Sequence, residues 1–292
     1  MIFLDHLING LSLGSIYAII ALGYTMVYGI AKMLNFAHGD VIMVGAYVAF
    51  CGLQYWGLSP VLAILVAMVA CTILGITIEG LAYRPLRQAA SLAVLITAIG
   101  VSYLLQNIAL MIWGANPKSF PTTFINGTSI RLGQLSISSA TIITILANVV
   151  IMVGLTLFTT KTKMGKAMRC VSEDRGAAEL MGINVNRTIS LTFAIGSALA
   201  AIAGILLCSS YPILQPTTGS MPGIKAFTAA VFGGIGSIPG AMLGGILLGV
   251  IEIFGKAYIS TELGDAIVFA VLIIVLLVKP AGLLGKPMRE KV

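Results

Sequence analysis

The sequence predicts an all-α fold: a polytopic transmembrane helical bundle with broken or re-entrant helices. Of its 292 residues, 58% are hydrophobic and only 9% are charged, whereas about 25% of the residues of a soluble globular domain are charged. Two further observations support this fold class. Long apolar stretches recur along the chain, and polar segments that contain glycine interrupt them. We therefore expect one transmembrane domain over residues 1–292, in contact with a lipid bilayer.

Apolar stretches recur at lengths close to the about 20 residues that a spanning helix needs. They cover residues 7–30, 41–56, 60–83, 92–113, 138–159, 188–210, 241–258 and 264–279. None shows the polar/apolar alternation over about 10 residues that is typical of outer-membrane barrels. The first stretch lacks the basic leader of a cleavable signal peptide, because Lys32 is the first cation, so we expect it to remain as the first helix.

The distribution of basic residues predicts the orientation. Residues 160–187 contain Lys161, Lys163, Lys166, Arg169, Arg175 and Arg187, whereas residues 114–137 contain only Lys118 and Arg131. Because basic loops stay on the cytoplasmic side, 160–187 is predicted to be a cytoplasmic loop and 114–137 a loop on the opposite face. The same distribution of basic residues places the C-terminus on the cytoplasmic side of the membrane and the N-terminus on the opposite side. It also explains the net charge of +7 without a nucleic-acid partner.

The first polar interruption is the stretch NFAHGD, residues 35–40. One interpretation is a cytoplasmic turn in which Asp40 caps the next helix. The other is a break in a helix beside a transport pathway, since discontinuous helices mark such pathways. Our interpretation combines them: Asn35, His38, Gly39 and Asp40 stabilise a break at or near the pathway, and Asp40 caps the following helix.

The second interruption is GGIGSIPG, residues 233–240, which cannot form a regular helix. We predict a re-entrant pair within 211–263 that meets inside the membrane, where such backbone must face protein or water. Gly233, Gly234, Gly236 and Ser237 are the candidate pathway residues here. The two interruptions suggest an internal repeat whose second copy is 224–291.

The basic segment 161–187 has a helical pattern of Met164, Ala167, Met168 and Val171. The residues from Ser172 to Asp174 resemble a new helix start, and Gly182 resembles a helix end. One or two short amphipathic helices are therefore expected at the membrane surface. Small residues there permit the close approach of another protein, although charge alone fits a solvated loop equally well.

Together these motifs resemble the membrane permease of a branched-chain amino-acid ABC importer. The resemblance rests on NGLSLGSIYAIIALGYTMVYGI, NFAHGD, KMGKAMRCVSEDRGAAELMGI, AIGSALAAIAGIL and FTAAVFGGIGSIPGAMLGGILLG, and covers essentially the whole chain. It implies a subunit of the bacterial inner membrane that imports leucine, isoleucine and valine. Implied partners are a second homologous permease, two ABC ATPase subunits and a periplasmic binding protein. Sister importers of urea or short amides are the alternative.

The resemblance also implies a coupling helix that docks on the ATPase. Many such helices carry E-A-A-x-x-x-G, whereas this chain reads GAAELMG at residues 176–182, with Gly176 in place of the glutamate. The implied coupling residues are Glu173, Asp174, Arg175, Ala177, Ala178, Glu179 and Gly182. Whether Glu173 or Glu179 contacts the ATPase stays open.

The chain is not expected to be an enzyme. It has no G-x-x-x-x-G-K-[ST] phosphate loop, since Gly165-Lys166 precedes Ala167 and Gly285-Lys286 precedes Pro287. ATP and Mg are therefore expected on partner ATPase subunits, with no cofactor in this chain. With two histidines and no H-E-x-x-H, no metal site is expected either.

A secondary transporter or channel would be favoured by intramembrane carboxylates. No acidic pair falls at a span centre. Glu79, five residues before Arg84, is expected to snorkel or to pair near the cytoplasmic surface, and Glu252 is expected to pair with Lys256 on one helix face.

Local chemistry gives two smaller expectations. Asn126-Gly127 predicts a tight hairpin turn in the outer loop, which is either a plain connection or a contact for the binding protein. The four cysteines lack C-x-x-C spacing, so we expect free thiols.

Overall fold

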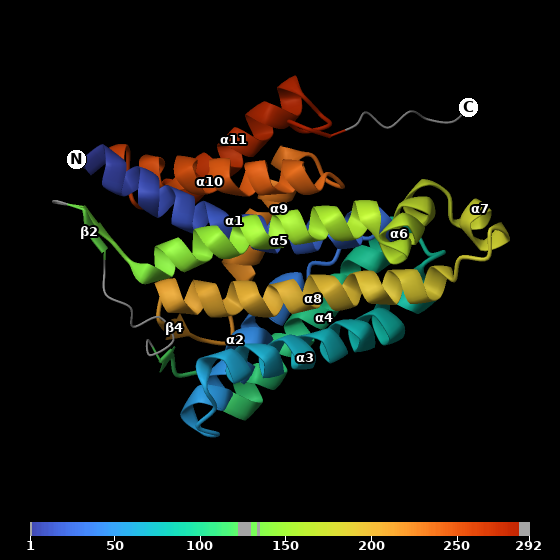
Figure 1. The fold of residues 1–292 in the computed structure, drawn as a ribbon, viewed down its shortest axis with the longest axis horizontal. Coiled ribbons are helices and arrows are strands. Elements are labelled where there is room, and N and C mark those ends of the chain that lie inside the picture. The colour runs from blue at the N-terminus through green and yellow to red at the C-terminus, as the bar shows by residue number, and fades with distance from the viewer. Residues whose placement is uncertain (1, 122–129, 133–134, 286–292) are drawn as a thin grey trace.

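The computed structural model describes residues 2–121, 130–132 and 135–285, and it is predominantly helical (Figure 1). This confirms the all-α, polytopic fold. Among the described residues, six helical segments are long and apolar enough to cross a membrane. They are α1 (Ile2–Ala31), α3 (Pro60–Ile78) with its extension to Leu86, α4 (Ser91–Trp113), α5 (Ser139–Lys161), α8 (Val185–Ser210) and α10 (Ile238–Tyr258).

Shorter elements account for the remaining apolar stretches. Two of these stretches form the shorter helices α2 (His38–Gln54) and α11 (Gly264–Val278), and a third short helix, α9 (Ser220–Gly233), precedes α10. The extension of α3 consists of η1 (Glu79–Tyr83), a π-helix, and η2 (Arg84–Leu86), a 3₁₀-helix. Two further helices, α6 (Lys163–Glu173) and α7 (Arg175–Leu180), lie in the basic segment.

Most of the long helices run along one direction of the molecule (Figure 1). Helix α7 projects at one end, here called the α7 end, and the strand β4 (Ile213–Leu214) lies towards the other, the β4 end. Helices α1 and α8 are mostly buried, while α3, α4 and α5 expose most of their apolar windows. Exposed apolar residues on outer helices are expected of a surface that faces lipid rather than water.

Small residues bring α1 against α10. A Cβ atom added at Gly14 would lie 2.7 Å from the Cα of Ile246, and Gly249 packs on Gly14 in the same way. Close helix contacts through glycine are the usual packing mode in membranes, where dispersion replaces the hydrophobic effect between helices. The two helices are antiparallel, so α10 carries the chain back towards the β4 end.

Short strands cover the β4 end. β1 (Lys118–Ser119) pairs with β4, and β2 (Ile130–Leu132) pairs with β3 (Leu135–Ile137), each antiparallel. The predicted turn at Asn126-Gly127 lies outside the described residues, so it stays a prediction.

Candidate functional site

The first break carries the chain back into the bundle. Helix α1 ends at Ala31, and α2 begins at His38, whose ring lies against Gly23, because a Cβ atom there would be 2.7 Å from the His38 Cε1. Gly23 precedes Ala31 by eight residues, or about 12 Å of helix. The non-helical residues 32–37 therefore return from the α7 end, and α2 begins inside the protein.

The polar residues of this break are buried within the chain itself. Asn35 is 4% exposed, and His38 and Asp40 are each 1% exposed. The Tyr83 hydroxyl donates to Asn35 Oδ1 at 2.9 Å, and Gln106 Nε2 donates to Asp40 Oδ1 at 2.8 Å. In this chain they brace the start of α2 against α3, α4 and α1 rather than face an open cavity.

The prediction that Asp40 caps α2 is wrong. Ala37 is the N-cap and has no capping side chain, and Asp40 lies in the first turn. Its carboxylate is instead bonded to Gln106 on α4. A negative charge in the first turn still lies favourably at the positive end of the helix dipole.

A second helix begins beside the first one. A Cβ atom added at Gly39 would lie 2.7 Å from the carbonyl oxygen of Gly219, and Gly223 packs on Gly39 as well. Gln106 Nε2 also contacts Ser220 Oγ at 3.2 Å, so one amide holds the starts of both α2 and α9. Sequence reasoning missed this position; the signal was the cluster of Pro216, Gly219 and Pro222.

The predicted re-entrant pair that meets inside the membrane at 233–240 is wrong in its depth. The turn between α9 and α10 lies beside Gly29, near the end of α1, because a Cβ atom on Gly29 would be 3.2 Å from the Cα of Gly236. Helix α10 then has 21 residues, enough for a full crossing. Of the two helices, only α9 begins inside the bundle.

The candidate residues of this turn hold it together. Gly234 and Gly236 have φ of 106° and 96°, which favour glycine. Ser237 caps α10, with its Oγ accepting from the Gly240 amide at 3.3 Å. The C-terminal segment docks here, since the amides of Leu283 and Leu284 donate to the carbonyls of Phe232 and Gly233, each at 2.9 Å.

The basic segment, predicted to form one or two short helices, forms two, α6 and α7. Asp174 ends α6 and caps α7, accepting a hydrogen bond from the Ala177 amide at 3.0 Å. Gly182 follows α7 with φ of 79°. Met168 and Val171 are buried as expected, whereas Met164 is exposed.

The exposed surface of α7 differs from the expected one. Ala178 is 3% exposed and packs on its own chain, whereas Leu180 is 90% and Met181 81% exposed. Ala177, Glu179 and Glu173 are exposed. A docking protein would therefore meet Ala177, Leu180 and Met181, because Ala178 is already covered.

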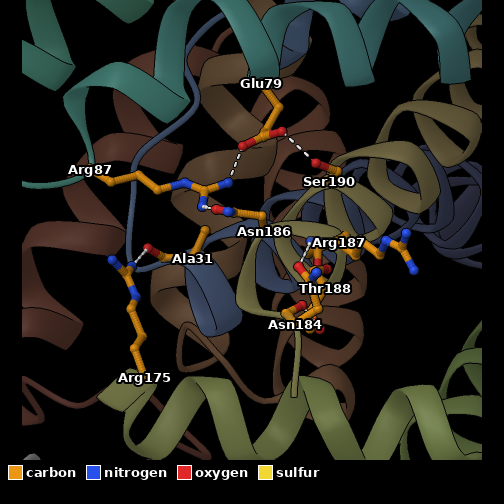
Figure 2. A network of polar contacts seen from close by, with 10 residues as sticks. Ala31, Glu79, Arg87, Arg175, Asn184, Asn186, Arg187, Thr188 and Ser190 are labelled. Carbon is orange, nitrogen blue, oxygen red and sulfur yellow. Dashed lines mark hydrogen bonds and ion pairs between the residues drawn. The ribbon is translucent and has the colours of Figure 1, made fainter. Parts of the chain in front are cut away.

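A polar network joins α7 to the first break (Figure 2). Arg175 donates to the carbonyl of Ala31, the last residue of α1, where a cation is favoured by the helix dipole. Burial, with a smaller contribution from the charge of Arg87, lowers the pKa of Arg175 from its usual value. Movement of α7 would thus reach the end of α1, directly before residues 32–37.

Glu79 forms an ion pair, one of its two predicted arrangements, and its partner is Arg87. Arg87 also donates to Asn186, and Ser190 Oγ donates to Glu79 at 2.6 Å (Figure 2). The pairing ties the extension of α3 to the start of α8. The carboxylate is buried rather than snorkelling.

A buried charge cluster lies nearer the β4 end. Glu252 accepts from Lys256 at 2.5 Å, which confirms the predicted pair, and also from Lys225 at 2.7 Å and the Tyr17 hydroxyl at 2.9 Å. Lys225 contacts Asp265 at 2.6 Å. The cluster joins α1, α9, α10 and α11, and its convergence was invisible in the sequence because Tyr17 and Glu252 are far apart along the chain.

The cysteines are not paired with one another. Cys51, Cys71, Cys170 and Cys208 are free thiols. Within residues 2–121, 130–132 and 135–285, no group of three or more His, Cys, Asp or Glu side chains is arranged to hold a metal ion.

Comparison with known proteins assigns this architecture. The family model described as the permease component of the branched-chain amino acid transport system matches residues 6–276. The chain belongs to this permease family. The match includes both breaks and the α6–α7 segment.

Relatives of this permease are similar along their whole length. The high-affinity branched-chain amino acid transport system permease protein BraD of Pseudomonas aeruginosa is 47% identical, covering 99% of this chain and 98% of its own. LivH of Salmonella typhimurium, of the same description, is 48% identical with the same coverage. A probable branched-chain amino acid transport permease protein, LivH of Methanocaldococcus jannaschii, is 32% identical over 93% of this chain and 89% of its own.

Proposed function

We propose that this permease is the membrane subunit of an ATP-driven importer of leucine, isoleucine and valine. The observation that carries the proposal is the full-length identity of 47–48% to permeases of high-affinity branched-chain amino acid systems. The chain lacks a phosphate-binding loop, so ATP and Mg bind to two partner ATPase subunits. The complex lies in the bacterial inner membrane. A second permease completes the pathway, and a periplasmic binding protein delivers the substrate to it.

The mechanism begins at α7, which docks on an ATPase through Ala177, Leu180 and Met181. Closure of the ATPases upon ATP binding displaces α7, and Arg175 transmits the displacement to the end of α1. Residues 32–37 and the start of α2 move with it, because they follow the end of α1 directly, and the hydrogen bonds of Asn35 and Asp40 pass the movement on to Tyr83 and Gln106. Rocking of the two permeases then exposes a shared cavity to each side in turn.

Asn35, His38 and Asp40 act in this scheme as positioning residues. Their burial in the chain argues that they set where α2 begins rather than bind the amino acid. Gly233, Gly234, Gly236 and Ser237 shape the connection between α9 and α10. The substrate cavity itself lies at the interface with the second permease, where an apolar wall with a few polar groups suits a branched side chain and a zwitterionic head.

Uptake by the purified complex in proteoliposomes tests the proposal. The tagged chain is purified in mild detergent, its partners are identified by mass spectrometry, and radiolabelled leucine uptake is measured with the binding protein outside and ATP inside. We expect two ATPases and a second permease as partners. Uptake should require ATP, be inhibited by vanadate, and be competed by isoleucine and valine.

Other outcomes point to the alternatives. Competition by urea or acetamide but not by isoleucine would identify a sister importer. Uptake driven by an ion gradient, by a chain that is purified without ATPases, would identify a secondary transporter. Omitting ATP from matched liposomes is the internal control.

A further inference from the structure

An open groove lies between α3 and α8 at the α7 end. It has a volume of about 480 Å³ and is lined by Ile76, Arg84, Asn184, Asn186, Arg187, Ser190, Leu191 and Ala194. This volume is within the range of about 300–1,000 Å³ that is typical of small-ligand sites. The groove is separate from both helix breaks and from the exposed residues of α7.

The groove has a charged part and an apolar part. Helices α3 and α8 are antiparallel, since Gly75 packs on Ser197 whereas Glu79, further along, accepts a hydrogen bond from Ser190. Arg84 and Arg187 therefore both lie nearer the α7 end, while Ile76 and Ala194 both lie deeper. Seven or eight helical residues separate the two parts, which corresponds to about 10–12 Å.

The two arginines are available to a ligand. Within the described parts of the chain, neither guanidinium has a hydrogen-bond or ion-pair partner, and both residues are exposed. Figure 2 shows the Arg187 side chain extending away from Glu79 and Arg87. Glu79 is already paired with Arg87, and no acidic residue lines the groove, so its charge is positive.

Two amides add donors beside the arginines. Asn184 Oδ1 accepts from the Arg187 backbone amide, and Asn186 Oδ1 accepts from Arg87. Their NH₂ groups are left to donate. A guanidinium group can donate two parallel hydrogen bonds to phosphate oxygens, and an amide NH₂ group can donate another, so these side chains are suited to bind a phosphodiester.

We propose that this groove binds an anionic phospholipid, with its phosphate between Arg84 and Arg187 and an acyl chain along Ile76, Leu191 and Ala194. Both walls lie at ends of helical segments that are long and apolar enough to cross a membrane, so in a bilayer crossed by these segments the two arginines would lie at the level of the lipid headgroups. Basic pockets between helices at this depth are suited to anionic headgroups. A soluble phosphate would use the arginines but not the apolar wall, and an acidic protein surface would not use the deeper part.

The site has a structural consequence. A lipid bridging Arg84 and Arg187 would join the extension of α3 to the start of α8, beside the Arg87–Glu79–Ser190 contacts that already connect them. This inference is independent of the transported substrate.

Native mass spectrometry of the full-length protein tests the site. The protein is titrated in detergent with phosphatidylglycerol or with phosphatidylcholine of the same acyl chains. We expect a preference for phosphatidylglycerol, and a roughly 10-fold loss of its binding in Arg84→Gln/Arg187→Gln. The matched control Lys163→Gln/Lys166→Gln removes the same charge from exposed positions of α6 and should bind as the unmodified protein does.

Further experiments distinguish a phospholipid from free phosphate as the ligand. Leu191→Gln should weaken phosphatidylglycerol binding, because it changes only the apolar wall. Equal binding of both lipids, unchanged binding by the double arginine variant, or an equal loss in the lysine control would overturn the proposal. Displacement of the lipid by millimolar inorganic phosphate, with Leu191→Gln unaffected, would show a soluble-anion site and overturn it too. Gel filtration confirms that each variant is folded, and Arg187→Gln alone serves if the double variant is not.

Discussion

Gly39 and Gly219 lie in direct contact where the two helices that begin inside the bundle start. Neither position has room for a side chain, since each Cβ atom would meet the other residue's carbonyl oxygen. The contact sets the starts of α2 and α9 against each other. Glycine is needed here for space rather than for an unusual backbone angle.

Replacing Gly39 by alanine should therefore destabilise the protein. Overpacking of this kind costs about 1–3 kcal/mol, so we expect a lower thermal unfolding midpoint and reduced uptake. The matched control is Gly154→Ala on α5, where an added Cβ meets nothing within 4 Å and alanine is the better helix former. Equal midpoints for the two variants would show that α2 and α9 are not in contact.

Glu252 is the hub of the buried charge cluster, because it accepts from Lys225, Lys256 and Tyr17. Glu252→Gln removes the buried negative charge, and among the described residues it leaves Lys225 with the partly exposed Asp265 as its carboxylate partner. Removing one partner of a buried pair costs about 3–5 kcal/mol, an upper bound here since Asp265 remains. We expect a marked fall in the unfolding midpoint, measured by nanoscale fluorimetry.

Lys256→Gln is the control for this prediction. The Lys256 side chain is 35% exposed, and a partly exposed pair contributes about 1 kcal/mol or less. A similar loss in both variants would contradict the assignment of Glu252 as the hub.

At the scale of elements, α7 is short and its two faces have different roles. Ala178 packs inward, whereas Leu180 and Met181 project from the α7 end. An exposed apolar pair on a projecting helix is typical of a protein contact. The buried face is held by α6 and the start of α8.

Substitution on the two faces should separate docking from folding. Leu180→Glu is expected to leave the unfolding midpoint unchanged and to weaken ATPase binding by about 10-fold or more, as for a central contact residue. Ala178→Glu should instead lower the midpoint, because it buries a charge. Co-purification of the ATPase and the thermal midpoint are measured together; normal ATPase retention in Leu180→Glu would exclude this face.

The connection between α9 and α10 shows how one element depends on a distant one. Its glycines predicted a break correctly. Its place was decided by α10, which needs its full length to cross the bundle, and by residues 283–284, which pair with the end of α9. Neither constraint is local to residues 233–240.

At the scale of the whole molecule, the basic residues predict which end of the protein faces the cytoplasm, and cysteine labelling tests this orientation. Cys170 is exposed on α6, and Ala115 is exposed near β1. If the α7 end is cytoplasmic, an impermeant maleimide added to intact spheroplasts should label the variant Ala115→Cys/Cys170→Ser. It should label Cys170 of the unmodified protein only after lysis.

The opposite labelling pattern would show that the proposed topology is inverted. The sides assigned to the ATPases and to the binding protein would then be exchanged as well. The control is Cys170→Ser alone. It reports any reaction of the half-buried Cys51 and the buried Cys71 and Cys208.

The sequence alone determined the all-α membrane fold, the helical character of the α6–α7 segment and the Glu252–Lys256 pair. These follow from composition and from neighbours within one or two helical turns. Only the tertiary structure decided that α2 begins inside the bundle, that Asp40 bonds to Gln106 instead of capping α2, and that Lys225 and Tyr17 meet Glu252. Such contacts join residues from separate helices, and helix packing, rather than local sequence, brings them together.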